Sequence, residues 1–230
     1  MKILVTGGGG FVGNVLTRRL LQAGYSVRVV DNFIKGCYGL MELIPNPNFE
    51  FMNGDVTDFS VCKKAVDGVD AIIHLAAIVG FPDCANQPGL AEAVNIGGTT
   101  NMLAVAYGRP LAFASTGSVY GKVEGICTEE SPLNAQSWYG KTKYIAEQKV
   151  MEQENTVAFR FATGFGLSPN MRVNLLVNDF VYKAVYDKAL VVFQADFRRT
   201  FIHVQDMAKT FQMGIEGLVN KTLKYKVYNA

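Results

Sequence analysis

The sequence lacks the long apolar runs that membrane-spanning helices need. No stretch of its 230 residues approaches the roughly 18 to 20 consecutive apolar residues of a spanning helix. The short apolar run at the amino terminus is soon interrupted by glycines, so we expect no signal peptide. We therefore expect a cytoplasmic protein without a membrane partner.

The sequence contains few cysteines, and its numbers of positive and negative side chains are nearly equal. The four cysteines show no C-x-x-C spacing, which argues against a structural zinc site and a disulfide framework. The 22 basic and 20 acidic residues leave a net charge of +2, so nothing indicates a nucleic-acid-binding surface. Internal repeats and low-complexity tracts are also missing. We expect reduced thiols, no bound metal and no nucleic-acid partner.

What the sequence does contain is apolar material arranged in short runs. Hydrophobic residues make up 49% and charged residues 18%, which is enough for a sizeable core. Strand-like runs alternate with helical patterns, the runs being residues 2–6, 26–30, 49–52, 71–77, 111–114 and 157–161. This alternation predicts an α/β fold with a doubly wound parallel sheet of the Rossmann type. Ligands then bind beyond the carboxyl ends of its strands.

A glycine-rich turn separates the first strand from the first helix. Gly8, Gly10 and Gly13 fit G-x-G-x-x-G, and Gly7, Gly10 and Gly13 fit the wider G-x-x-G-x-x-G spacing. Such a turn lets backbone approach a pyrophosphate at the positive end of a helix. Asp31 ends the second strand, where a carboxylate accepts a hydrogen bond from a ribose 2′-hydroxyl and repels a 2′-phosphate. The motif predicts bound NAD, the alternative being a glycine turn without a ligand.

Tyr139 and Lys143 stand four residues apart on a predicted helix. That spacing places a phenol and an ammonium on one helical face. A nearby cation lowers the pKa of a phenol from its usual value of about 10. The pair therefore indicates proton transfer in alcohol and carbonyl chemistry, although the same spacing also occurs by chance on amphipathic helices.

Taken together, these motifs resemble the extended short-chain dehydrogenase/reductases, and among them the NAD-dependent nucleotide-sugar epimerases and dehydratases of the UDP-glucose 4-epimerase type. The resemblance runs over essentially the whole chain. It is carried by residues 6–13, Asp31, 54–56, 74–77, 95–99, 115–121, 139–143, Arg160 and 199–204.

The resemblance implies roles for individual residues. The catalytic residues would be Thr116, Tyr139 and Lys143. The cofactor-binding residues would be Gly7, Gly10, Phe11, Val12, Gly13, Asp31, Asn32, Asp55, Val56, Leu75, Ala76, Ala77, Asn95, Tyr139 and Lys143. The substrate-binding residues would be Thr163, Arg172 and Arg199, since guanidinium groups suit phosphates and other anions. Thr116 and Asp55 have a plainer alternative as strand-end residues, and Arg199 has one as a surface charge. We expect His74 and His203 to be packed or backbone-bonded rather than catalytic.

Departures from the family pattern narrow the reaction. Gly117 and Ser118 follow Thr116 where the dehydratases carry Asp-Glu, so water elimination is not expected. Thr163 replaces an asparagine that often touches the sugar nucleotide. We therefore expect an NAD-dependent epimerase that acts on a nucleoside-diphosphate sugar through a transient keto-sugar. The alternatives are a net oxidoreductase, which would release NADH, and a non-catalytic NAD-binding protein.

The end of the chain departs most from the resemblance. Relatives usually continue for several dozen residues beyond the strand that residues 226–229 resemble, so this chain is either a shortened homologue or a fragment. We expect an NAD-binding domain over residues 1–163 and a small, incomplete substrate-binding lobe over 164–230, with 201–217 returning to the first domain. Apolar side chains over residues 165–193, Tyr182, Val185 and Tyr186 among them, should be exposed, mobile or buried by a second subunit of a homodimer. The alternative is a small lobe that is complete in itself.

Overall fold

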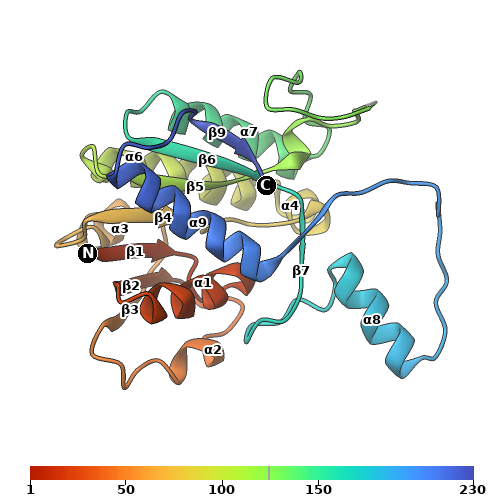
Figure 1. Cartoon of the computed structure of the whole chain (residues 1–230), viewed down its shortest axis with the longest axis horizontal. Helices are drawn as coiled ribbons and strands as arrows, with labels where there is room; N and C mark the ends of the chain where they lie inside the picture. The colour runs from red at the N-terminus through yellow and green to blue at the C-terminus, as the bar shows by residue number, and fades with distance from the viewer. Residues whose placement is uncertain (124) are drawn as a thin grey trace.

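A seven-stranded parallel sheet forms the centre of the protein (Figure 1). The computed structural model describes residues 1–123 and 125–230. Its strands are β1 (Lys2–Thr6), β2 (Ser26–Asp31), β3 (Phe49–Asn53), β4 (Ala71–His74), β5 (Leu111–Thr116), β6 (Thr156–Phe161) and β9 (Val227–Asn229). The order β3-β2-β1-β4-β5-β6-β9 reverses direction between β1 and β4. The predicted doubly wound sheet is confirmed, and this reversal is where such sheets bind ligands.

Helices cover both faces of the sheet, as the alternation of buried residues along β1 requires. Ile3 and Val5 belong to one core cluster, and Leu4 between them belongs to the other. The first cluster is closed by α1 (Phe11–Gln22) and α9 (Val204–Val219). The second is closed by α3 (Phe59–Ala65), α6 (Thr99–Ala106) and α7 (Trp138–Met151). A strand buried on both faces explains why these segments read as continuous apolar runs.

Polar residues begin two of these helices. Asp58 accepts hydrogen bonds from the backbone nitrogens of Ser60 and Val61 at the start of α3. Ser137 accepts one from the backbone nitrogen of Gly140 at 3.0 Å and so begins α7. Both are ordinary N-cap arrangements that satisfy otherwise unpaired N–H groups.

One element differs from its predicted extent. The apolar run 71–77 is a strand only to His74, because the backbone nitrogen of Ala76 donates to the side chain of Thr6 (3.3 Å) instead of continuing the ladder. The helical segment before β5 consists of three consecutive elements. These are α5 (Pro88–Glu92), the π-helical turn η1 (Ala93–Gly98) and α6.

The chain between β6 and α9 is organised differently. The strands β7 (Thr163–Phe165) and β8 (Phe201–His203) pair in parallel, and α8 (Leu176–Tyr186) lies between them in sequence. Figure 1 shows α8 apart from the sheet, with a long connection running back to α9. Tyr182, Val185 and Tyr186 are 48%, 56% and 71% exposed, so the expected exposure of this surface is confirmed in the single chain.

Shorter elements complete the described structure. They are α2 (Tyr38–Met41), α4 (Phe81–Asn86) and the 3-10 turn η2 (Gly117–Val119). Within the residues that the structure describes, no helix combines the length and the apolar character that crossing a membrane requires.

Candidate active site

The glycine turn between β1 and α1 lies where the strand order reverses. Gly7 has a φ of +71°, and a Cβ there would stand 2.7 Å from the backbone nitrogen of Ala76. A Cβ on Gly13 would collide with the carbonyl oxygen of Gly7. Helix α1 begins after Gly10 with no side-chain cap and no acidic residue in its first turn. Its N–H groups and positive dipole end therefore fit the diphosphate of a dinucleotide, beside Phe11 and Val12.

Asp31 faces this turn from the end of β2. Its Oδ2 accepts a hydrogen bond from the backbone nitrogen of Gly9 at 2.9 Å, and its Oδ1 accepts one from Phe33 at 2.8 Å. Burial raises the pKa of Asp31, and these two hydrogen bonds act in the opposite direction. Each carboxylate oxygen keeps a second lone pair that can accept from a ribose hydroxyl. The same side chain thus holds the glycine turn and offers acceptors beside it.

Asn32 and Asp55 are brought together from the ends of two neighbouring strands. Asn32 Nδ2 donates to Asp55 Oδ2 at 2.9 Å, and Asp55 Oδ1 accepts from the backbone nitrogen and the hydroxyl of Thr57, both at 2.8 Å. Burial alone would raise the pKa of Asp55, but these hydrogen bonds outweigh it and the pKa is lowered. Val56, the next residue, is buried and packs against Gly98.

The residues after β4 form the facing wall of the turn. The backbone nitrogen of Leu75 donates to the carbonyl oxygen of Thr6 at 3.1 Å. Ala76 follows with its bond to the Thr6 side chain, and both it and Ala77 are half-buried. Two small residues here leave room against the backbone of the glycine turn.

Asn95 supports that wall from η1. It is fully buried, and its Oδ1 accepts from the backbone nitrogen of Ile78 at 2.8 Å. Its Nδ2 donates to the carbonyl oxygen of Ile78 at 3.1 Å and to the hydroxyl of Thr142 at 3.0 Å. Its amide thus ties the segment after β4 to α7.

Thr116 ends β5, and α7 carries Tyr139 and Lys143 past it. The helix comes very close to the turn after Thr116, since a Cβ on Gly140 would stand 2.8 Å from the carbonyl oxygen of Ser118. A larger residue at position 140 would push α7 away from that turn. The three residues expected to be catalytic are therefore brought to one place.

Burial dominates the electrostatics of Tyr139 and Lys143. It raises the pKa of Tyr139 to about 12, although a hydrogen bond with Thr116 acts in the opposite direction. It lowers the pKa of Lys143 to about 7, and the Lys143 ammonium lies 4.0 Å from the centroid of the Phe113 ring. The pKa of Tyr139 is therefore raised and not lowered as expected, because desolvation of the phenol outweighs the effects that act in the opposite direction.

The three residues expected to bind substrate are placed differently. Arg172 is half-buried, and its charge acts on Tyr139, whose pKa it lowers. Thr163 begins β7, where its backbone nitrogen donates to the carbonyl oxygen of Thr200 at 3.1 Å. Arg199 is exposed and makes no hydrogen bond or ion pair with any residue that the structure describes. The structure therefore brings Arg172, but not Arg199, to the catalytic residues.

Two side chains that the sequence did not single out hold the substrate-side segment on the glycine turn. Ser168 Oγ donates to the carbonyl oxygen of Phe11, and Asn170 Nδ2 donates to that of Gly9, both at 2.7 Å. Residues 167–172 look like a substrate loop from sequence, but no local pattern places them on residues so far away in the chain.

The two histidines make structural contacts within the protein. His74 is buried between Thr6 (2.6 Å) and Thr99 (3.1 Å), and burial lowers its pKa to about 3. His203 Nδ1 accepts from the backbone nitrogen of Gln205 and begins α9. Their expected structural roles are confirmed by these contacts. Among residues 1–123 and 125–230, no group of three or more His, Cys, Asp or Glu side chains is arranged to hold a metal ion.

Several proteins that are similar to this chain are named as enzymes of nucleotide sugars. The sequence pattern of the NAD dependent epimerase/dehydratase family matches residues 3–230. UDP-glucuronic acid decarboxylase 1 of Danio rerio is 34% identical over 98% of this chain, and the chain spans 56% of that relative. UDP-glucose 4-epimerase 2 of Arabidopsis thaliana is 28% identical over 99% of the chain and 75% of the relative.

A solved structure extends the comparison to bound ligands. UDP-glucuronic acid 4-epimerase from Bacillus cereus, in complex with UDP-glucuronic acid and NAD, has a TM-score of 0.84 and 26% identity. The match covers all of this chain and 77% of that one.

Proposed function

The chain belongs to the NAD dependent epimerase/dehydratase family, and within it we propose that this protein is an NAD-dependent epimerase of a nucleoside-diphosphate sugar. The observation that carries the proposal is the convergence of Thr116, Tyr139 and Lys143 beside the glycine turn. The family is NAD-dependent, and NAD, when bound, accepts a hydride from the sugar and returns it.

The cofactor would be held by the walls of the groove. The uncapped start of α1, with Gly7, Gly10 and Gly13, would bind the diphosphate. Asp31 would accept from the adenosine ribose, with Asn32, Asp55 and Val56 near the adenine. Leu75, Ala76 and Ala77 would line the opposite wall, backed by Asn95. The fit rests on the close backbone approach at Gly7 and Gly13 and on the open N–H groups of α1.

The proton transfer would take place at the Tyr139 hydroxyl. As the phenolate, Tyr139 Oη would take the proton of a sugar hydroxyl while a keto-sugar forms, and the resulting phenol would give that proton back when the hydroxyl is restored. Thr116 would donate a hydrogen bond to the reacting oxygen. Lys143, in its ammonium form, would oppose the high pKa of Tyr139 and stabilise the phenolate. The sugar turns between the two steps, so its configuration is inverted.

A second candidate is decarboxylation of a nucleoside-diphosphate uronic acid. It is favoured by the 34% identity to a UDP-glucuronic acid decarboxylase and by the place of Arg172. A guanidinium that acts on Tyr139 would suit a carboxylate on the sugar. Oxidation to a keto-sugar begins both reactions, so the same three catalytic residues serve either one.

Residues 1–163 would be the NAD-binding domain and 164–230 part of the substrate lobe, with 201–217 returning to the first. Thr163, Arg172 and Arg199 would contact the sugar nucleotide. A homodimer and a cytoplasmic location stay predictions.

Product analysis tests the proposal. The protein is incubated with NAD and either UDP-glucose or UDP-glucuronic acid, and the sugars are identified by NMR. Epimerisation gives an isomer of equal mass without net NADH, decarboxylation gives a pentose with loss of carbon dioxide, and net oxidation accumulates NADH. The Tyr139→Phe variant controls for contaminating activity. Absence of any sugar product from wild-type protein that binds NAD would refute the enzymatic proposal.

A further inference from the structure

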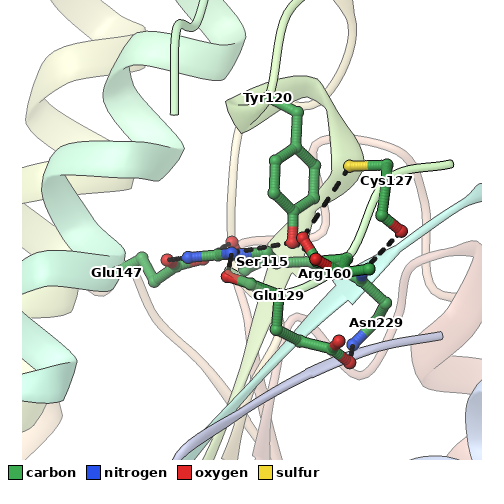
Figure 2. A network of polar contacts seen from close by, with 8 residues as sticks. Ser115, Tyr120, Cys127, Glu129, Glu147, Arg160 and Asn229 are labelled. Atoms are coloured by element: carbon green, nitrogen blue, oxygen red, sulfur yellow. Dashed lines mark hydrogen bonds and ion pairs between the residues drawn. The ribbon is translucent and has the colours of Figure 1, made fainter. Parts of the chain in front are cut away.

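A buried charged network joins α7 to β5 and β6 (Figure 2). Glu147 is fully buried, and its Oε2 accepts a hydrogen bond from Ser115 Oγ at 2.5 Å. Arg160 Nη2 donates to its Oε1 at 2.6 Å, and Arg160 Nε donates to both carboxylate oxygens at 3.1 Å. The carboxylate is thus clamped between β5 and β6.

The network continues away from α7 toward the last strand. Arg160 Nη1 donates to the Tyr120 hydroxyl at 2.7 Å, and that hydroxyl donates to Asn229 Oδ1 at 2.7 Å. The backbone nitrogen of Asn229 donates to Glu129 Oε1 at 2.7 Å. Figure 2 shows these side chains converging from β5, α7, β6 and β9.

A contribution to the stability of the fold does not by itself explain why the chain buries the Glu147–Arg160 ion pair. Replacing a buried ion pair with apolar residues is often neutral or stabilising, because both ions lose their hydration on burial. Its position gives a better reason. Glu147 is four residues beyond Lys143, which is four beyond Tyr139, so all three share one face of α7. Ser115, which fixes Glu147, immediately precedes Thr116.

Of the groups that act on Lys143, Glu147 contributes the largest electrostatic effect, and it raises the pKa of the lysine against the effect of burial. From β4, His74 is neutral because burial lowers its pKa to about 3. From α4, the Cys84 thiol is neutral because burial raises its pKa to about 11. Tyr139 is neutral as well. The negative charge of Glu147 is therefore what opposes the desolvation of the Lys143 ammonium.

We propose that Glu147 is a positioning residue for Lys143. Clamped by Ser115 and Arg160, it holds a negative charge one turn behind the lysine and keeps that side chain in its ammonium form. The inference rests on the proposed function only in assigning Lys143 a catalytic role. The clamp itself can be tested without turnover.

The first test measures the ionisation of Lys143 directly. Protein carrying ¹³C-labelled lysine is titrated by NMR, with and without NAD, and the Lys143 signal is assigned by its loss in Lys143→Arg. Glu147→Gln should lower the pKa of Lys143 by about one unit. Glu147→Asp, which keeps the charge, should restore most of it. Tyr120→Phe, which removes one hydroxyl of the same network without touching Glu147, should leave it unchanged.

A second variant covers the case in which Glu147→Gln does not fold. Glu147→Gln/Arg160→Met removes both charges, so no unpaired ion stays buried. Its Lys143 should also titrate below the wild-type value. If Lys143 titrates at the wild-type pKa in this variant, or if Tyr120→Phe shifts it as far, the proposal is wrong.

The second test measures catalysis. A fall of one unit from about 7 would cut the protonated fraction of Lys143 at pH 7 about fivefold, so kcat should fall about fivefold and KM should change less than twofold. Activity depends on the ammonium form, so the descending limb of the pH profile should move to lower pH and acidification should restore turnover. A kcat loss that acidification does not restore would contradict the inference. If wild-type protein turns over no sugar nucleotide, the proposed function fails and the NMR titration still decides the role of Glu147.

Discussion

Two regions of the chain differ in how far their apolar side chains are buried: the residues around the sheet, and residues 165–200. Around the sheet, large side chains such as Phe113 and Phe211 are fully buried. In α8, only Asn178 is buried, and its amide bonds the backbone of Gly166 and Arg172. The residues proposed to bind NAD therefore lie on packed strands and helices, whereas Arg172 and Arg199, which are proposed to contact the sugar nucleotide, lie in the part of the chain with few buried apolar side chains. Close packing makes geometry reproducible, so the cofactor side should be the more rigid of the two.

The largest expected difference between these regions is in stability. Phe211→Ala, on the buried face of α9, should lower the free energy of unfolding by about 3–5 kcal/mol, because it leaves a cavity. Tyr186→Ala on α8 should change it by less than about 0.5 kcal/mol. Urea unfolding of both variants measures the contrast. Surface substitutions rarely change the free energy of unfolding by more than about 0.5 kcal/mol. If Tyr186→Ala lowered it by more than about 2 kcal/mol, the side chain would be buried in solution and α8 would be packed against another part of the protein.

The next largest effect separates chemistry from binding. Tyr139→Phe should reduce turnover by roughly 10²-fold or more, the scale of general acid–base contributions. The affinity for NAD should stay nearly unchanged, because the groove is built by other residues. Thr116→Ala should be milder, and Thr116→Ser close to neutral. Steady-state kinetics with calorimetry of NAD binding measures both. Wild-type turnover by Tyr139→Phe would remove Tyr139 from the mechanism.

At acidic pH the folded protein should lose stability, because His74 binds a proton more readily in the unfolded chain than in the folded sheet region. Its pKa falls from 6.5 to about 3 on folding, so the unfolded chain binds one more proton between those values. Stability should therefore fall as pH drops through this window, with a slope of about 1.4 kcal/mol per pH unit. His74→Gln, which keeps hydrogen-bonding groups but does not titrate there, should lose this part of the slope. Equal slopes in urea unfolding at several pH values would exclude His74 as the cause.

The smallest expected effect concerns cofactor choice. Asp31 should make NAD bind at least about tenfold more tightly than NADP, or ~1.4 kcal/mol, because a 2′-phosphate would face its carboxylate. Asp31→Asn should narrow that preference. Arg28 cannot reverse it readily, since its guanidinium is engaged by Glu50 and by backbone carbonyls. Calorimetry with both cofactors is the measurement, and tighter binding of NADP by wild-type protein would refute the assignment.

The fold and much of the site could be predicted from local sequence, because local rules govern them. Alternating apolar runs specify strands buried on both faces, and the glycine spacing marks a backbone that must pass close to Ala76. The i, i+4 spacing alone places Tyr139 and Lys143 on one face of α7. Even the short β9 could be recognised at residues 226–229.

Contacts between segments that are far apart in the sequence could not be predicted in this way. Nothing near Asn170 in sequence indicates its bond to Gly9, and nothing near Glu147 indicates that Ser115 and Arg160 hold it, although its spacing from Lys143 was a usable signal. Such contacts depend on which elements the sheet order brings together, and a strand pattern does not determine that order.

The sequence by itself therefore determined the element types, the glycine turn and the identity of the groups that can move a proton. The tertiary structure decided their ionisation. An isolated helix with Tyr139 beside Lys143 would favour the phenolate, but packing against β5 and η2 removes water from both groups. Desolvation penalises a charged form whatever its sign, so the pKa of the phenol rises to about 12 and that of the ammonium falls to about 7.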